Sequence, residues 1–395
     1  MKLGTLVSTA DDGLFAAGER MDGTDGSLSA FLVRTDRAGE DLWRRTVEGS
    51  AAVAALDPVD GGFLVLLGYP APRLLRLDGD GRTLWTRDIE MPDGVGFEPV
   101  ALVAREVGGY AIAGVSVEGI RVGPDAFAER RSPVVMAVDS DGHERWRRTF
   151  PAPDIIVSSD GKGNVEWGPG SDIATGIAAT GGGYLLVSNP EGEPPVVRAL
   201  GARVEERWRR SYGNVYGGYL RSITPTPEGF VLTGRILDPE ADSEVPWLLA
   251  IDDAGEPLWS YGYLFSDGPD AAAADFAALE VDSDGSLVVA GTYHPDGHWS
   301  DRSRPMLARI GRDGSQVQWV RQYGDRGGIG EAVARTSDGS MVLAGERNGS
   351  WTEGLLIHAG RPTASNLGSV LPVRIEPEPA SERFIQDRSG PSSHR

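Results

Sequence analysis

The chain of 395 residues contains no cysteine. Disulfides, zinc sites with thiolate ligands and thiol nucleophiles are therefore excluded. Histidine is scarce too, with five in the chain, and no G-x-S-x-G, P-loop or H-E-x-x-H motif occurs. No stretch approaches the roughly 18 apolar residues of a membrane helix. We expect no membrane insertion, and the sequence indicates no particular reaction.

Lysine is nearly missing, because Lys2 and Lys162 are the only two and the other 36 basic residues are arginines. With 58 acidic residues, the formal net charge is -20. Such a surface repels nucleic acid and anionic membranes, so neither is expected as a partner. Adaptation to high salt in a GC-rich genome is the simplest explanation, and a cationic ligand is the alternative.

The first residues, MKLGTLVSTADDG, lack the roughly 7–15-residue apolar core of a signal peptide. We therefore expect a soluble, cytoplasmic monomer. An extracellular protein is expected only if the gene start is misplaced.

Two phrases recur along the chain. One is an apolar run, a turn and a tryptophan, and it occurs six times, ending at Trp43, Trp85, Trp146, Trp208, Trp259 and Trp319. The other, such as GGYAIAG or EGFVLTG, occurs seven times and usually closes on glycine. A repeat of roughly 40–60 residues built from short strands is typical of a propeller. We predict an all-β, seven-bladed β-propeller of four-stranded antiparallel blades spanning residues 1–376.

The repeated tryptophans have a structural interpretation. A large aromatic at one fixed blade position is expected to pack between adjacent blades, with its N–H bonded to a neighbouring turn. The turn phrases at residues 78–81 and 139–142, DGDG and DSDG, are interpreted as hairpin turns because the rest of the calcium-loop pattern is missing.

The D-x-x-G-x-x-x-W phrase resembles the tryptophan-docking motif of quinoprotein-like (PQQ-type) β-propellers. The wider pattern resembles propeller repeat proteins of that superfamily, including haloarchaeal ones, over about residues 4–360. Quinone-dependent dehydrogenases of the family generally have eight blades, and many carry a vicinal disulfide over the cofactor. About seven repeats without cysteine depart from that pattern, so we expect no cofactor.

The seventh repeat is incomplete, because no tryptophan phrase follows its third strand candidate at residues 354–359. The only β-like segment left is SVLPVRI, at residues 369–375. We predict that this segment is the outer strand of blade 7 and closes the ring. The remaining tail, residues 377–395, is rich in proline, serine and charge and is predicted to be disordered.

Loop lengths distinguish the two ends of the propeller. With the strands of a blade named A to D from the axis outward, the A–B and C–D turns are uniformly short, and we call their end the plain face. The B–C and D–A connections lie at the other end, which we call the elaborated face. All the long insertions belong to it, at residues 19–29, 115–132, 150–172, 236–245, 264–273, 293–304 and 347–351. Function concentrates on variable loops that a rigid scaffold holds, so we expect it there.

Few side chains in these loops can carry chemistry. His294 and His298, with Asp301 nearby, could bind a transition metal, but a Pro-Asp-Gly turn with exposed histidines is the simpler interpretation, and no metal is predicted. Trp167, Trp299 and Trp351 lie outside the repeated tryptophan positions. They can stack on a sugar or anchor a protein, although packing of the loops on themselves fits equally well.

These features predict a non-catalytic binding or scaffold module that holds a protein or glycan partner on the elaborated face. The alternative is an enzyme that acts on a polysaccharide or uses a cofactor at the channel mouth. A convergent cluster of carboxylates there, or His294 and His298 pointing into the channel, would favour the enzyme.

Overall fold

The computed structural model describes residues 2–21, 27–56, 62–105, 108–122, 127–159, 165–213, 217–238, 243–266, 271–324, 327–347, 354–360 and 370–374. Their regular secondary structure is entirely β, as predicted. No helix among them is long and apolar enough to cross a membrane.

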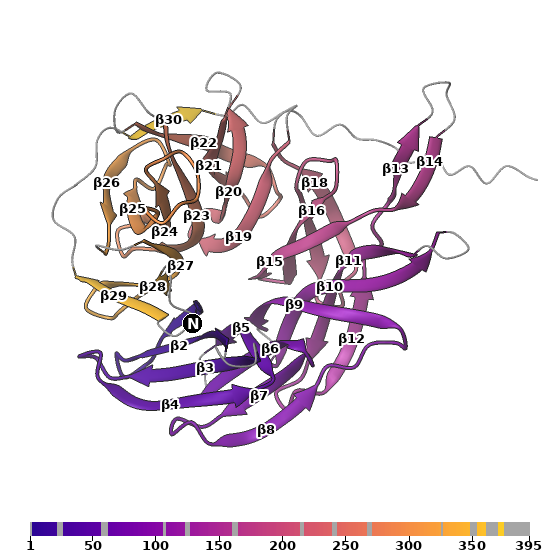
Figure 1. The fold of residues 1–395 in the computed structure, drawn as a ribbon, viewed down its shortest axis with the longest axis horizontal. Coiled ribbons are helices and arrows are strands. Elements are labelled where there is room, and N and C mark those ends of the chain that lie inside the picture. The colour runs from indigo at the N-terminus through magenta and orange to yellow at the C-terminus, as the bar shows by residue number, and fades with distance from the viewer. Residues whose placement is uncertain are drawn as a thin grey trace, which may run out of the picture.

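The strands form seven blades that are arranged as a propeller (Figure 1), with blades 5 and 6 joined in one sheet. This arrangement confirms the predicted seven-bladed β-propeller. Blade 1 contains β1 (Lys2–Ser8), β2 (Leu14–Met21), β3 (Leu28–Thr35) and β4 (Asp41–Glu48). Blade 2 contains β5 (Ser50–Leu56), β6 (Phe63–Pro70), β7 (Arg73–Leu77) and β8 (Thr83–Asp88). Blade 3 contains β9 (Val95–Ala104), β10 (Tyr110–Arg121), β11 (Phe127–Val138) and β12 (Glu144–Thr149). A separate hairpin, β13 (Asp154–Ser159) and β14 (Val165–Pro169), leads to blade 4.

Blade 4 contains β15 (Asp172–Thr180), β16 (Gly183–Pro190), β17 (Val196–Gly201) and β18 (Glu206–Ser211). Blade 5 contains β19 (Tyr219–Thr226), β20 (Gly229–Asp238), β21 (Ser243–Ile251) and β22 (Pro257–Ser266). Blade 6 contains β23 (Ala271–Val281), β24 (Leu287–His294), β25 (Arg304–Ile310) and β26 (Val317–Gln322). Blade 7 has three strands in the described residues, β27 (Gly328–Arg335), β28 (Met341–Arg347) and β29 (Gly354–Gly360), and β30 (Val370–Arg374) lies elsewhere.

The predicted closure of blade 7 by residues 369–375 is wrong. β30 pairs antiparallel with β22, from Tyr261 opposite Arg374 to Phe265 opposite Val370, and so adds an outer strand to blade 5. β22 is ten residues long, whereas the outer strands β8, β12, β18 and β26 have six, and its pairing with β21 ends at Gly262. The alternating pattern of residues 369–375 indicates a strand but does not identify the edge that it joins.

The ring closes by packing between its two ends. β1 of blade 1 lies against β27 and β28 of blade 7. Leu3 shares a buried cluster with Ala332 and Ala344, and the Ser8 hydroxyl donates a hydrogen bond of 2.5 Å to the carbonyl oxygen of Arg335. The predicted tail, residues 377–395, lies outside the described residues.

The glycine that closes the second repeated phrase has a structural cause. Strand A usually carries a bulge, for example between Phe276 and Ala278 in β23, and strand B passes close to it. A Cβ atom on Gly291 would lie 1.9 Å from the carbonyl oxygen of Asp275, and one on Gly234 would lie 2.0 Å from that of Tyr219. Only glycine fits such an approach, so the repeated glycine marks the bulge of the inner strand.

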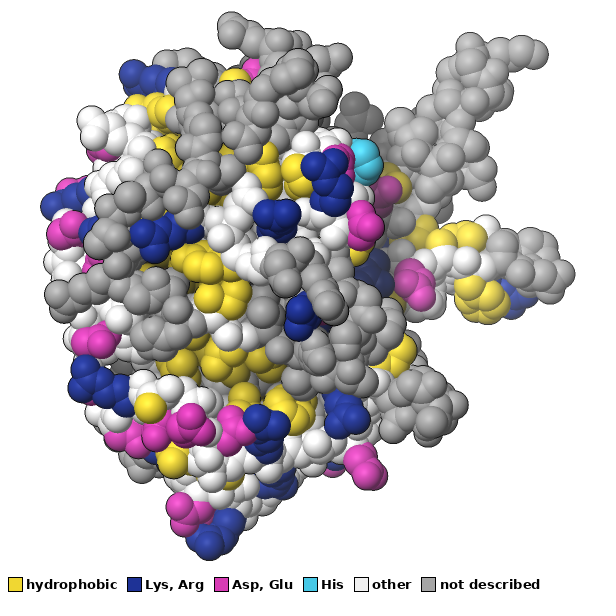
Figure 2. Space-filling view, turned by 60° about the vertical axis from the view of Figure 1, so that its left-hand side comes forward, with side chains coloured by type: hydrophobic (Ala, Val, Ile, Leu, Met, Phe, Trp, Pro, Cys, Tyr) yellow, Lys and Arg dark blue, Asp and Glu magenta, His cyan; other side chains and the backbone are white. Residues whose placement is uncertain are grey.

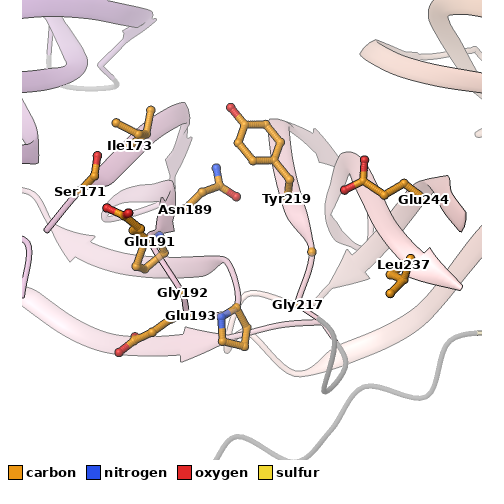
Figure 3. Close-up of a pocket in the computed structure, with 13 residues that line it drawn as sticks. Ser171, Ile173, Asn189, Glu191, Gly192, Glu193, Gly217, Tyr219, Leu237 and Glu244 are labelled. Carbon is orange, nitrogen blue, oxygen red and sulfur yellow. The ribbon is translucent and has the colours of Figure 1, made fainter. Parts of the chain in front are cut away.

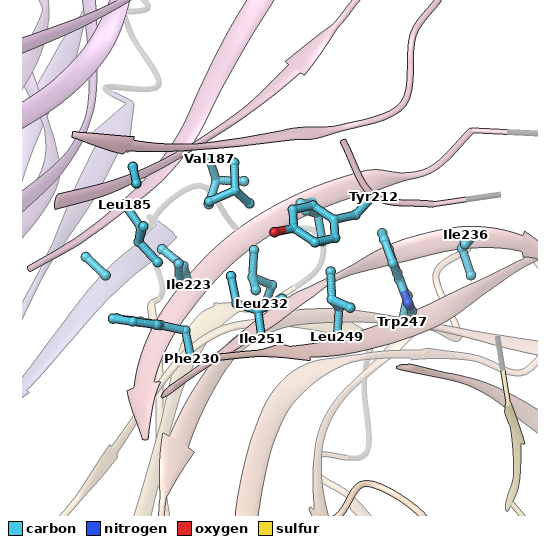
Figure 4. Close-up of a cluster of buried hydrophobic side chains, with 14 of the residues drawn as sticks. Leu185, Val187, Tyr212, Ile223, Phe230, Leu232, Ile236, Trp247, Leu249 and Ile251 are labelled. Carbon is cyan, nitrogen blue, oxygen red and sulfur yellow. The ribbon is translucent and has the colours of Figure 1, made fainter. Parts of the chain in front are cut away.

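The hydrophobic core fills the spaces between neighbouring blades. Figure 4 shows the layer between blades 4 and 5, where Leu185 and Val187 of blade 4 meet Leu232 and Leu249 of blade 5. All four are at most 1% exposed. Burial of large branched side chains in these layers, at about 25 cal/mol per Å² of apolar surface, is the main force that holds the blades together.

Candidate functional site

Three cavities meet at Tyr219, the first residue of β19. The largest lies on the elaborated face between blades 4 and 5 and has a volume of about 750 Å³. We call it the blade 4–5 pocket, and Figure 3 shows Glu191 and Glu244 on opposite sides of Tyr219. The second, of about 540 Å³, is lined by inner strands of the channel, and the third has about 360 Å³. Because Tyr219 lines all three, they adjoin one another.

Blade 4 fixes the position of Tyr219. The side-chain amide of Asn189 donates to the carbonyl oxygen of Leu220 at 2.9 Å and accepts from the Leu220 N–H at 2.8 Å. The Thr175 hydroxyl donates to the same carbonyl at 2.8 Å. Asn189 therefore pairs with Leu220 as a neighbouring strand would, and this fixes the start of β19.

The third cavity is what we call the mouth site, and its polar side chains are Tyr219, Arg221, Arg235 and Asp275. The Arg235 guanidinium lies over the Tyr219 ring, 5.3 Å from its centroid, and pairs with Glu244 at 3.4 Å. Arg221 extends from blade 5 to Glu331 of blade 7, with Nη2 and Oε2 2.6 Å apart. Blades 5, 6 and 7 thus all contribute to the walls of the site or to their support.

The Glu331 carboxylate forms ion pairs with two basic side chains. Its other carboxylate oxygen lies 3.1 Å from Nζ of Lys2, so that one carboxylate joins blades 1, 5 and 7. The Glu331 side chain is 12% exposed. A largely buried carboxylate is stable when cations pair with it, so Lys2 and Arg221 compensate for its burial.

Asp275 is held by a chain of hydrogen bonds. Nε2 of His294 lies 3.0 Å from Oδ2 of Asp275, and Nδ1 of the same ring lies 2.9 Å from the Ser303 hydroxyl. Ser303 also accepts from the Ser300 N–H at 2.9 Å, so its own proton can go to Nδ1. That assignment leaves the His294 proton on Nε2, where it donates to Asp275. The hydrogen bond from His294, together with the charges of Arg221 and Arg235, lowers the pKa of Asp275 despite its partial burial.

The same three residue types form the catalytic triad of serine hydrolases, but here the order of exposure is reversed. Ser303 is 0% exposed and His294 is 4% exposed, whereas the Asp275 side chain is 48% exposed. A substrate can reach the carboxylate but not the hydroxyl. Nucleophilic attack by Ser303 is therefore ruled out, and the accessible group is an ionised, oriented carboxylate.

The structure places the residues predicted from the sequence in different environments. His294 is buried as the last residue of β24, so the interpretation as an exposed histidine does not hold for it. His298, Trp299 and Asp301 are exposed in the following loop, with Trp299 at 58%. The side chain of Trp167, on β14, and the whole of Trp351 lie outside the described residues.

His294 and His298 are not among the potential metal ligands that come together in groups of three or more in the described residues. Among the described residues, potential metal ligands come together at Asp139, Asp141 and His143, in a plain-face turn. Oδ1 of Asp139 accepts from the backbone N–H groups of Asp141 and His143 at 3.0 and 2.8 Å. This carboxylate caps a hairpin turn, as the sequence predicts.

The sequence analysis missed the mouth site. Its members stand alone in inner strands or come from distant repeats, as Arg221 and Glu331 do, so no local motif groups them. One signal was present, because Asp275 is a lone carboxylate in the small and apolar stretch AAAADFAAL. A charged residue in a strand that faces a channel indicates a specific partner.

The comparisons with known proteins define the fold only. The chain matches no protein-family model and no curated protein. Among solved structures it is similar to the Dos1 propeller, with 10% sequence identity and a TM-score of 0.50 over 92% of this chain and 93% of that one. It is also similar to Sqt1 from Chaetomium thermophilum, with 10% identity and a TM-score of 0.48 over 91% and 96% of the two chains. A protein of unknown function from Bacteroides caccae has 14% identity and a TM-score of 0.45 over 79% and 97%. At 10% identity the likeness to the Dos1 propeller extends to the fold and not to an activity.

Proposed function

We propose that the protein is a non-catalytic binding module that holds a protein or glycan partner on its elaborated face. The distribution of exposed apolar side chains carries this proposal. Of the six large ones in the described residues, Leu42, Leu84 and Leu258 each precede a repeated tryptophan on an outer strand. The other three, Val122, Phe127 and Trp299, lie on elaborated-face connections, where the blade 4–5 pocket also lies.

Exposed aromatics of this kind are typical anchors of an interface. Phe127 is 72% exposed at the start of β11, and Trp299 is 58% exposed in the loop after β24. Burying a side chain such as Trp or Phe against a partner contributes up to several kcal/mol, and few such residues dominate binding. Figure 2 shows acidic and basic side chains interspersed on the face in view.

The accessible chemistry supports binding more than catalysis. Glycoside hydrolysis needs a carboxylic acid whose pKa is raised so that it can protonate the leaving group. The pKa of Asp275 is lowered instead, mainly by the hydrogen bond from His294. Burial raises the pKa of Glu280 to about 7, but Glu280 does not line the mouth site.

Affinity capture from native extract in molar salt tests the proposal. The wild-type chain is immobilised beside Trp299→Ala and Leu84→Ala, which truncate side chains that are 58% and 57% exposed. We expect Trp299→Ala to lose the partner and Leu84→Ala, beside the plain face, to retain it. Recovery of no partner, together with turnover of a glycan panel, would instead establish the enzyme alternative.

We also propose a relationship to the quinoprotein-like repeat proteins, which the D-x-x-G-x-x-x-W phrase supports. Its tryptophan packs on the glycine of the next blade's turn, as Trp85 does on Gly142 and Trp208 on Gly255. That the module is a cytoplasmic monomer and binds no nucleic acid stays a prediction from the sequence.

A further inference from the structure

The mouth site presents hydrogen-bond donors in fixed positions. Arg221 is held by Glu331 and Arg235 by Glu244 and the Tyr219 ring. A guanidinium carries five N–H donors in a rigid fork, and each of these carboxylate contacts engages one nitrogen. Both side chains line the cavity of about 360 Å³, so further N–H groups are placed to meet a ligand there.

The site also presents an acceptor in a fixed position. Asp275 lines the same cavity, and the buried His294 holds its Oδ2. An ionised carboxylate accepts hydrogen bonds and donates none. A ligand in this cavity therefore meets donors on the blade 5 side and an acceptor on the blade 6 side.

The charges around the site compensate one another. Glu331 pairs with Arg221 and Lys2, and Glu244 pairs with Arg235. Asp275 faces the same cavity as the two arginines. An anionic ligand would find Arg221 and Arg235 already paired, and removing a partner from such a pair is unfavourable. A cationic ligand at Asp275 would also face these two arginines, which line the same cavity and repel it. A neutral group that both donates and accepts hydrogen bonds fits without displacing any pair.

We propose that the mouth site binds a neutral saccharide whose hydroxyl groups donate to Asp275 and accept from Arg221 and Arg235. This inference rests on the proposed binding function and assigns its ligand class. A hydroxyl group donates and accepts through a single oxygen, and a saccharide carries several such groups. The adjoining blade 4–5 pocket, of about 750 Å³ and also lined by Tyr219, gives a chain of several sugar units room to continue onto the face.

The test is binding of full-length protein to a panel of neutral oligosaccharides and uronate-containing oligosaccharides, followed by calorimetry on the best neutral one. We expect Asp275→Asn and Arg221→Gln each to weaken that binding at least about tenfold, because each removes a charge-assisted hydrogen bond to the ligand. Asp253→Asn and Arg203→Gln make the same chemical changes at exposed plain-face turns and should leave the affinity unchanged. The affinity should also stay nearly constant between low and molar sodium chloride, because the ligand is uncharged.

A second arginine variant separates a loss of binding from a loss of folding. Arg221→Lys keeps the charge that pairs with Glu331 but lacks the fork, so we expect it to fold like the wild type and still bind at least about fivefold more weakly. Melting temperatures check that each variant is folded.

Three results would overturn the inference: no binding of any neutral saccharide, unchanged affinity in folded Asp275→Asn, or preference for uronates with an affinity that falls with salt. Capture of a partner that depends on Trp299 would then leave the proposed binding function standing without its saccharide ligand. Failure of both assays would remove both proposals.

Discussion

The indole N–H of Trp43 donates a hydrogen bond of 2.9 Å to the carbonyl oxygen of Gly79, which belongs to the next blade. The ring covers Gly81 of the same turn so closely that a Cβ there would lie 2.9 Å from it. Gly314 is covered in the same way by Trp259. At the equivalent glycine of blade 1, Gly39, no atom of the described residues lies within 4 Å of such a Cβ. Blade 7, its preceding neighbour, has no repeated tryptophan phrase.

The difference in stability between alanine variants of Gly39 and Gly81 measures how tightly Trp43 packs on the turn of the next blade. Gly39 and Gly81 have φ of +83° and +79°, so alanine is strained at both, by about 1–2 kcal/mol. Only Gly81→Ala also collides with Trp43, and we expect it to lose about 1–3 kcal/mol more stability. Urea unfolding of both variants checks this. Equal losses would show that the tryptophan does not press on the turn.

The position of β30 predicts the effect of shortening the chain. Deleting residues 370–395 uncovers the part of β22 that pairs with β30, between Tyr261 and Phe265. We expect faster amide exchange at residues 261–265 and a lower melting temperature, because an outer strand and its hydrogen bonds are lost. Deleting residues 376–395 keeps β30 and should change neither. If amide exchange became faster at residues 354–360 instead, the deleted strand would pair with blade 7, as the sequence predicted.

Glu280 makes stability depend on pH. Burial raises its pKa to about 7 from 4.5, so the folded state binds its proton more tightly than the unfolded state does. Stability therefore falls as pH rises from about 4.5 to about 7. Glu280→Gln removes this dependence, and we expect it to raise the free energy of unfolding by about 2–3 kcal/mol at pH 8 but hardly at pH 4. The control is Glu118→Gln, at an exposed position. If both variants raise the free energy of unfolding equally at pH 8, the pKa of Glu280 is not raised by burial.

The acidic excess predicts a response to salt. With 58 acidic and 38 basic residues, repulsion between exposed carboxylates outweighs the surface ion pairs, which contribute only about 0–1 kcal/mol each. The screening length falls from about 30 Å at 0.01 M to about 3 Å at 1 M. We expect the melting temperature to rise markedly from dilute buffer to molar sodium chloride. A flat response would reject adaptation to high salt and leave a cationic partner as the explanation for the acidity.

The repeated features could be predicted from the sequence, and the unique ones could not. Trp43 and its equivalents recur because every blade meets a neighbour in the same way, so the pattern revealed the blades. The mouth site occurs once and its members are far apart in the chain. Asp275 and His294 meet only through the pairing of β23 with β24, and Arg221 and Glu331 only because the ring closes. For the same reason, residues 369–375 indicated a strand but not its partner, β22.

The most direct test of the central claim, that the elaborated face binds the partner, is site-specific photo-cross-linking. A photoreactive amino acid replaces Phe127 on the elaborated face in one variant and Leu42 beside the plain face in another, residues that are 72% and 52% exposed. Both variants are irradiated in native extract in molar salt, and adducts are identified by mass spectrometry. The account predicts a discrete adduct from position 127 and none from position 42. Adducts from position 42 alone, or from neither position, would contradict it.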